Sequence, residues 1–113
     1  MNLDSFFFKR HNEHNYNCAH FAEEVWEALV GKSVELRSIE IQGADLSLRK
    51  RFRRAKPREY PAIVLMRSRN RPLHVAVLIE QDRAIHLRAS GVNCLPLQVV
   101  TLGYSSVGLY IPC

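Results

Sequence analysis

The sequence lacks the cysteine pattern of a disulfide-stabilised domain. It contains only Cys18, Cys94 and Cys113, and no two of them form a CxxC pair. An odd number of cysteines in a short chain argues against a disulfide framework. We therefore expect at least one of the three to be a thiol that is open to other chemistry.

Long apolar runs are also absent. No stretch approaches the roughly 18 apolar residues that a membrane-spanning helix needs. The opening residues, MNLDSFFFKRHNEHN, have an apolar triplet but no basic leader and no extended hydrophobic region, so they do not resemble a signal peptide. We expect synthesis in the cytoplasm, and any action in a virion or the periplasm would need another delivery route.

Glycine and proline are sparse, with five of each among 113 residues, and we find neither a repeat nor a low-complexity segment. Hydrophobic residues make up 47% of the chain and charged residues 24%, as in ordinary globular domains. A chain of this length supports one modest core. We therefore expect residues 1–113 to form a single domain.

The net charge of +5 is concentrated in one segment. The stretch RKRFRRAKPR, residues 49–58, carries seven positive charges and no negative one, which leaves −2 for the rest of the chain. Such a segment could bind phosphates or another polyanion, or it could be a solvated helix face and loop.

The clearest predicted element is a helix between Asn17 and Gly31. Asparagine is a good N-cap, and glycine is favoured just past a helix end. An apolar stripe runs along the segment, with glutamates largely opposite. Its members are Phe21, Ala22, Val25, Trp26, Ala28 and Leu29. Cys18 falls on the stripe side, where the core meets the start of the helix.

The second half of the chain has the pattern of short strands. Five β-branched-rich runs are separated by turn residues. They cover residues 62–67, 74–80, 83–89, 95–102 and 107–112. The short link at residues 81–82 makes the second and third runs a hairpin. We predict an α+β domain in which the N-terminal helix packs on an antiparallel sheet of about five strands.

Two further segments have weaker patterns. Residues 32–43 alternate imperfectly and fit either a short strand or a connection. Residues 45–55 carry apolar positions at helical spacing and predict a short helix, followed by a loop between Pro57 and Pro61.

Cys18 is the strongest candidate for a reactive group. A helix N-terminus stabilises a thiolate through its unpaired amides and macrodipole. His20 is poorly placed as its base, because two residues along a helix rotate the side chain by about 200°. The alternative is a buried structural cysteine, since cysteine is often fully buried.

His74 and His86 are better partners for such a nucleophile. His74 heads an apolar strand, and His86 lies on the next strand of the predicted hairpin. Their even separation allows both side chains to share one face, at opposite or diagonal positions. A Cys–His–His relay therefore becomes available if the helix N-terminus meets this sheet.

The order of YNCAHFAEEVW and then HVAVLIEQDRAIHL resembles the NlpC/P60 superfamily of papain-like cysteine peptidases and amidases. In that family a cysteine opens a helix, a histidine heads a strand in an H-V-G-I-Y phrase, and a polar residue lies on the next strand. The resemblance covers residues 14–90 and implies that Cys18 is the nucleophile, His74 the base and His86 the orienting residue. It further implies cleavage of amide bonds in peptidoglycan stem peptides, without metal or organic cofactor, and short members resemble phage tail-associated cell-wall hydrolases.

The chain departs from the family pattern at several positions. Ala19 and His20 replace the usual Ser-Gly, and Ala76 replaces the glycine after the histidine. The phrase NCAHF is also similar to the NCEHF of lecithin retinol acyltransferase-like proteins, but in those the histidines precede the cysteine. We expect Tyr16, Asn17 and His20 to line the cleft beside the nucleophile.

Three other interpretations of the sequence stay open. A catalytically idle binding or phage tail assembly module on the same fold would explain the missing glycines. The basic segment 49–58 would suit a nucleic-acid-binding protein. A zinc site is the third, since histidine and cysteine are good zinc ligands, although their spacing here fits no common structural zinc motif. Its ligands would be His11, His14, Cys18 and His20.

Overall fold

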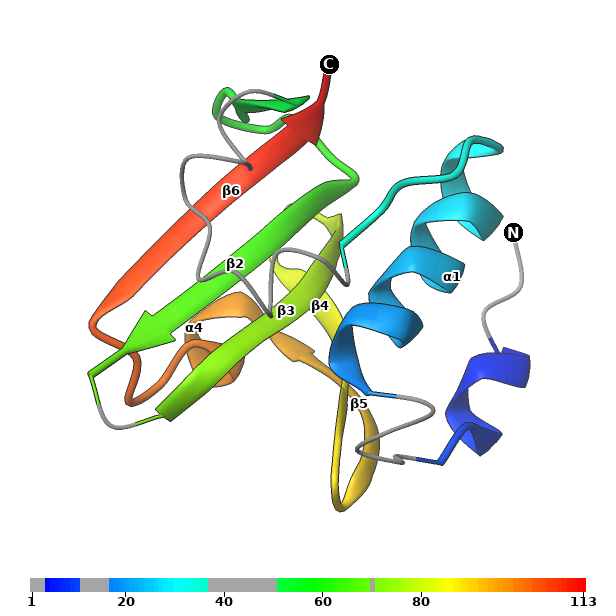
Figure 1. The fold of residues 1–113 in the computed structure, drawn as a ribbon, viewed down its shortest axis with the longest axis vertical. Helices are drawn as coiled ribbons and strands as arrows, with labels where there is room; N and C mark the ends of the chain where they lie inside the picture. Colours follow the sequence, from blue (N-terminus) through cyan, green and yellow to red (C-terminus); the bar gives the residue numbers. More distant parts are fainter. Residues whose placement is uncertain (1–3, 11–16, 37–50, 70) are drawn as a thin grey trace.

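One long helix and a six-stranded antiparallel sheet dominate the part of the chain that the computed structural model describes, which is residues 4–10, 17–36, 51–69 and 71–113 (Figure 1). The helical elements are η1 (Asp4–Phe8), α1 (Cys18–Val30) and α4 (Leu97–Val100). The strands are β1 (Phe52–Arg54), β2 (Ala62–Ser68), β3 (Arg71–Glu80), β4 (Arg83–Arg88), β5 (Gly91–Pro96) and β6 (Ser106–Pro112). The α+β class predicted from the sequence is confirmed.

Helix α1 begins and ends where the sequence predicted. The Asn17 side chain accepts hydrogen bonds from the amides of Ala19 (3.0 Å) and His20 (3.2 Å) and caps the first turn. At the other end Gly31 takes the left-handed conformation, with φ of 81°, and its amide donates to the Glu27 carbonyl. Only glycine adopts that conformation without a steric cost, so the helix stops there.

The sheet has the strand order β1-β6-β2-β3-β4-β5. The predicted hairpin is confirmed as β3 and β4, joined by a turn at Gln81 and Asp82, although β3 begins earlier, at Arg71. For residues 32–43 the sequence allowed a short strand or a connection. Residues 33–36 form an irregular connection, and residues 37–43 lie outside the described part.

The predicted helix over 45–55 is wrong at its end, because Phe52–Arg54 form the sixth strand, β1, while residues 45–50 lie outside the described part. This strand pairs with β6 from Tyr110 to Pro112, and it buries Phe52 against the core. Pairing and burial override the weak helical spacing of the sequence.

The predicted strand over 95–102 is also wrong in part. The strand there is Gly91–Pro96, and Leu97–Val100 turn into the short helix α4. The Leu97 amide donates to the Asp82 carbonyl (2.9 Å), and Val100 is buried beneath the turn. A short apolar run fits a strand or a buried helical turn equally well, which is why the pattern failed here.

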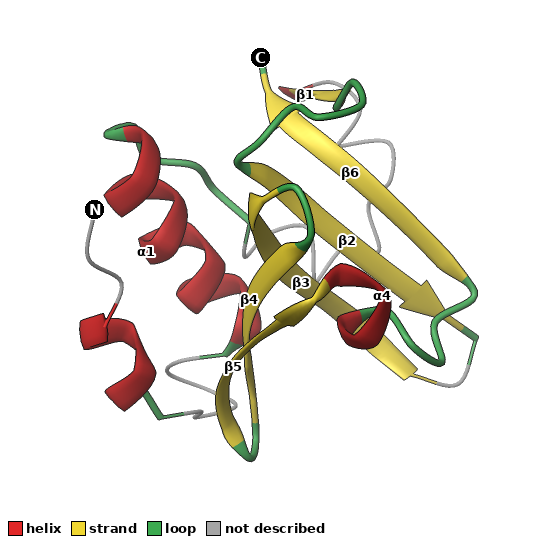
Figure 2. Cartoon of the chain, turned by 180° about the vertical axis from the view of Figure 1, so that it is seen from behind, coloured by secondary structure: helices red, strands yellow, loops and turns green. Residues whose placement is uncertain are grey.

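The sheet separates two apolar clusters. The larger lies between α1 and the sheet, where Val25 and Trp26 meet Ile63, Val77 and Ile85. The smaller lies on the other face, beneath α4, as Figure 2 shows from behind. It contains Ala62, Val64, Met66, Ala76, Leu78, Ala84 and Val100. None of the helices within the described residues combines the length and the hydropathy that crossing a membrane requires.

Candidate active site

Cys18 is the first residue of α1 and is 7% exposed. It belongs to the helix-side cluster, together with Val75 of β3 and Leu87 of β4. Helix α1 packs against both of these strands, and in Figures 1 and 2 its N-terminal end lies beside β4. The fold thus brings the thiol to the part of the sheet that carries the two predicted histidines.

His74 and His86 form a buried pair. His74 Nε2 lies 2.9 Å from His86 Nδ1, and the two side chains are 8% and 1% exposed. His74 lies three residues before Val77 and His86 one residue after Ile85, so the two imidazoles are diagonal to each other just past the last paired residues. The diagonal arrangement on a shared face is one of the two options that the sequence left open.

Strands β3 and β4 separate at this pair. Their register runs from Glu80 and Arg83 to Val77 and Ile85 and ends before the histidines are reached. Beyond that point the two strands diverge, as Figure 2 shows. The imidazoles alternate with Val75 and Ile85, so they belong to the face opposite the helix-side cluster. Past Val77 and Ile85, no β3–β4 pairing of the described residues lies between the helix-side cluster and the imidazoles.

Burial holds His86 in its neutral form. Desolvation lowers the pKa of His86 to about 4, and the nearby charge of Arg88 acts in the same direction. A neutral His86 can accept at Nδ1 the proton that a charged His74 donates from Nε2. His86 then carries its own hydrogen on Nε2, a buried atom with no hydrogen-bond partner among the described residues.

Tyr104 is a site residue that the sequence pattern did not reveal. Its ring stacks on that of His74, with centroids 6.2 Å apart and planes 9° from parallel. The Tyr104 ring also contacts a cation, because the Arg71 guanidinium lies 4.3 Å from its centroid. A tyrosine in the turn before the last strand belongs to no motif, so only the folded chain shows that this ring covers the histidine.

Gly103 shapes that turn. Its φ of 83° lies in the left-handed region, and a Cβ there would meet the Arg71 guanidinium at 2.7 Å. The Arg71 side chain also donates to the Leu102 carbonyl, at 3.4 Å. The turn that carries Tyr104 is thus fitted to Arg71.

The residues predicted to line the cleft have different places. His20 is half-buried, and its Nδ1 lies 3.2 Å from the Asn17 amide and 2.8 Å from Asn17 Oδ1. If His20 Nδ1 carries no hydrogen, it accepts from the Asn17 amide; if it carries one, it donates to Asn17 Oδ1. In either tautomer His20 is hydrogen-bonded to the cap residue of the helix. Tyr16 lies outside the described residues.

The predicted zinc ligands are only partly described. His11 and His14 lie outside the described residues, and His20 makes the cap contact with Asn17. Within the described ranges no three histidine, cysteine, aspartate or glutamate side chains gather in the way a metal site needs.

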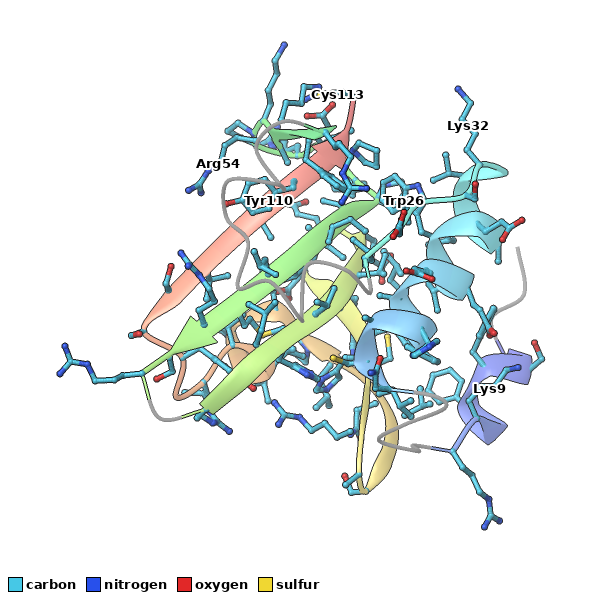
Figure 3. The ribbon with its side chains drawn as sticks, in the orientation of Figure 1. Lys9, Trp26, Lys32, Arg54, Tyr110 and Cys113 are labelled. Atoms are coloured by element: carbon cyan, nitrogen blue, oxygen red, sulfur yellow. The ribbon has the colours of Figure 1, made fainter. Side chains whose placement is uncertain are left out.

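The other two cysteines are less buried than Cys18. No cysteine forms a disulfide. Cys94 is half-buried on β5, and burial raises the pKa of its thiol. Cys113 is exposed at the end of β6 (Figure 3).

Much of the basic segment 49–58 is engaged within the molecule, and residues 49–50 lie outside the described part. Arg51 pairs with Glu35 at 3.8 Å, and Arg53 pairs with Glu59. Arg54 lies 5.1 Å from the Tyr110 ring centroid, a contact at the sheet edge that Figure 3 labels. These contacts reduce the charge that the segment offers to a polyanion.

Comparisons of the chain with protein-family models, with curated proteins and with solved structures find no match. The resemblance to the NlpC/P60 superfamily therefore rests on the sequence motifs.

Proposed function

We propose that this protein is a papain-like cysteine hydrolase of NlpC/P60 type that cleaves amide bonds in peptidoglycan stem peptides. The observation that carries the proposal is the buried 2.9 Å hydrogen bond between His74 and His86, on strands against which the helix headed by Cys18 packs. A nucleophile, a base and a group that orients the base are the parts that covalent catalysis by cysteine needs.

In the proposed mechanism His74 exchanges a proton with the Cys18 thiol at the place where the β3–β4 pairing ends. The His74 Nε2 atom is committed to His86, so the exchange uses Nδ1. The thiolate attacks the carbonyl carbon of the scissile amide and forms a tetrahedral intermediate. The imidazolium then gives its proton to the leaving amine, which leaves a thioester on Cys18.

A water molecule completes the cycle. His74 takes its proton as the water attacks the thioester carbonyl, and the thiol is regenerated with release of the acid. The backbone amide of Cys18 is the proposed oxyanion donor, because the Asn17 cap uses the amides of Ala19 and His20 instead. Neutral His86 accepts from the imidazolium and holds its ring in one orientation throughout.

Hydrolysis of purified muropeptides tests the proposal. We expect the wild-type chain to release peptide fragments detectable by mass spectrometry, and Cys18→Ala to abolish the release. Cys94→Ala is the matched control, since Cys94 is a half-buried cysteine on β5, and it should retain activity. Full activity in Cys18→Ala would contradict the proposal. His74→Ala should lose about 10²–10⁴-fold in kcat, the usual contribution of a general base.

A further inference from the structure

A cavity of about 460 Å³ lies on the α4 side of the sheet, away from α1. Its lining comes from the loop that follows β1, from β3 and its turn, from α4 and from β6 (Figure 2). Its floor begins at Leu78, four residues beyond His74 on β3, or about 13 Å along the strand. The cavity is therefore separate from the site of the proposed hydrolysis.

The floor of the cavity is apolar and comes from three elements. Leu78 of β3 is 3% exposed, and Leu97 of α4 and Leu109 of β6 pack beside it against the smaller cluster. Three leucines from separate elements form a surface that suits a branched or aromatic group.

The rim of the cavity is held in place by hydrogen bonds. The Ala55 amide donates to the Leu109 carbonyl at 2.9 Å, which joins the loop to β6. Within the loop, Glu59 accepts from the Lys56 amide at 2.9 Å and from Arg53 Nη1 at 2.8 Å. These donors lower the pKa of Glu59 to about 2, so the carboxylate stays charged well below neutral pH.

Arg58 has an unusual backbone at this rim. Its φ of 65° lies in the left-handed region, and it is the single non-glycine residue in the described ranges with a positive φ. Such a conformation costs of order 1 kcal/mol or more for an arginine and persists where the surroundings impose it. Arg58 is exposed and belongs to the cavity lining, one residue before Glu59.

The charges at the rim are unbalanced. Arg53 pairs with Glu59, whereas Lys56 and Arg58 form no ion pair within 4 Å among the described residues. Gln81 and the exposed Tyr60 add neutral hydrogen-bonding groups to the lining. Two cations above a leucine floor complement a molecule that has an apolar body and a negative end.

We propose that this cavity is a second binding site, for a carboxylate attached to a branched or aromatic apolar body. The apolar body rests on Leu78, Leu97 and Leu109, and the carboxylate accepts from Lys56 and Arg58. The same chemistry occurs in a small organic acid and at the C-terminus of a peptide that ends in an apolar residue. The site does not depend on the proposed hydrolase activity.

The test uses N-acetyl-L-tryptophan and its neutral counterpart, N-acetyl-L-tryptophanamide, titrated into the full chain. Binding is followed through the NMR shifts of the Leu78, Leu97 and Leu109 amides. We expect the acid to shift these amides and to bind about tenfold more tightly than the amide, as two charge-assisted hydrogen bonds allow. Added salt should weaken the binding of the acid and leave the binding of the amide unchanged.

Matched variants assign the effect to the rim. Lys56→Gln and Arg58→Gly should each lower the affinity for the acid about threefold. Glycine takes the left-handed conformation without strain, so Arg58→Gly removes the charge and keeps the loop fold. Lys32→Gln removes the same charge at the far end of α1 (Figure 3) and should leave affinity unchanged.

Three results would overturn the proposal: no shift at the three leucine amides, equal affinity for acid and amide, or equal weakening by Lys32→Gln and Lys56→Gln. The peptide N-acetyl-Gly-Gly-Trp separates the two sources of carboxylate. Binding of the peptide at the same amides, as tightly as the small acid, supports a chain terminus as the ligand. Weaker binding of the peptide supports a small acid.

Discussion

At the scale of single residues, the protonation states of His74 and His86 determine what the site can do. His86 is 1% exposed and its pKa is lowered to about 4 by burial, so it is neutral at physiological pH. A neutral imidazole that accepts at Nδ1 stabilises the charged form of His74 and fixes its ring. In the proposed mechanism His86 therefore positions and stabilises His74, whereas His74 itself moves protons.

Substitution of His86 tests that role. Asparagine at this position keeps an acceptor close to where Nδ1 lies, whereas leucine removes it. We expect His86→Leu to lower kcat by about 10²-fold with little change in KM, and His86→Asn to retain most of the activity. Muropeptide hydrolysis measures both, and circular dichroism checks that the two variants keep their fold. Equal activity in His86→Leu and wild type would rule the role out.

Tyr104 has a testable part in the same arrangement. Its ring lies nearly parallel to that of His74, so it restricts the movement of the imidazole. We expect Tyr104→Phe, which keeps the ring, to retain activity within about twofold, and Tyr104→Ala to lower kcat by about tenfold. The NMR signals of the His74 ring should move in Tyr104→Ala, which removes the stacked ring, and stay close to wild type in Tyr104→Phe. Unmoved His74 signals and full activity in both variants would leave Tyr104 with a packing role alone.

At the scale of elements, the sequence correctly predicts a helix or strand where its boundary residues and its apolar pattern indicate the same element. Helix α1 has a cap residue at Asn17, a left-handed stop at Gly31 and an apolar stripe between them, and the prediction was confirmed. The helical spacing of residues 45–55 had no such boundary signals, and the strand pairing of Phe52–Arg54 with β6 overrode it at the C-terminal end. Pairing between residues 56 to 60 positions apart depends on the whole sheet, so a local pattern does not show it.

The same reasoning applies to the site. The separation of 12 residues across a tight turn predicted that His74 and His86 share a face, and they do. Tyr104 comes from a turn that precedes a different strand, and its contact with His74 follows from the strand order β6-β2-β3. No spacing along the chain encodes that contact.

The cap of α1 gives a prediction at this scale. Asn17→Ala removes the acceptor for two first-turn amides and should lower the free energy of unfolding by about 1 kcal/mol. Asn17→Ser keeps a capping oxygen and should stay within a few tenths of wild type. Urea denaturation measures both. If the two variants were equally destabilised, the loss would come from packing and not from the cap.

At the scale of the whole molecule, the buried histidine couples stability to pH. The fold disfavours protonation of His86, whose pKa is about 4, whereas the unfolded chain protonates it near 6.5. The unfolded state therefore binds more protons between these values, and stability falls as the pH is lowered from about 6.5 to 4. Above pH 6.5 both states are neutral at this group, and it contributes no slope.

We expect this coupling to cost up to about 3 kcal/mol of stability on going from pH 7 to pH 4, at 1.36 kcal/mol per pKa unit. Denaturation of wild type and His86→Asn at a series of pH values measures the difference, because both carry the same other titrating groups. A wild-type slope no steeper than that of His86→Asn would contradict the buried neutral state.

The reactivity of Cys18 tests the central claim most directly. In a Cys94→Ser/Cys113→Ser background, the rate of alkylation by iodoacetamide is followed by intact-mass spectrometry between pH 5 and pH 9. The account predicts that at pH 6 Cys18 reacts faster than N-acetylcysteine amide, and that His74→Ala slows it at least about tenfold. A Cys18 that reacts no faster than the small thiol, at a rate that His74→Ala leaves unchanged, would show that it is a structural cysteine of the core.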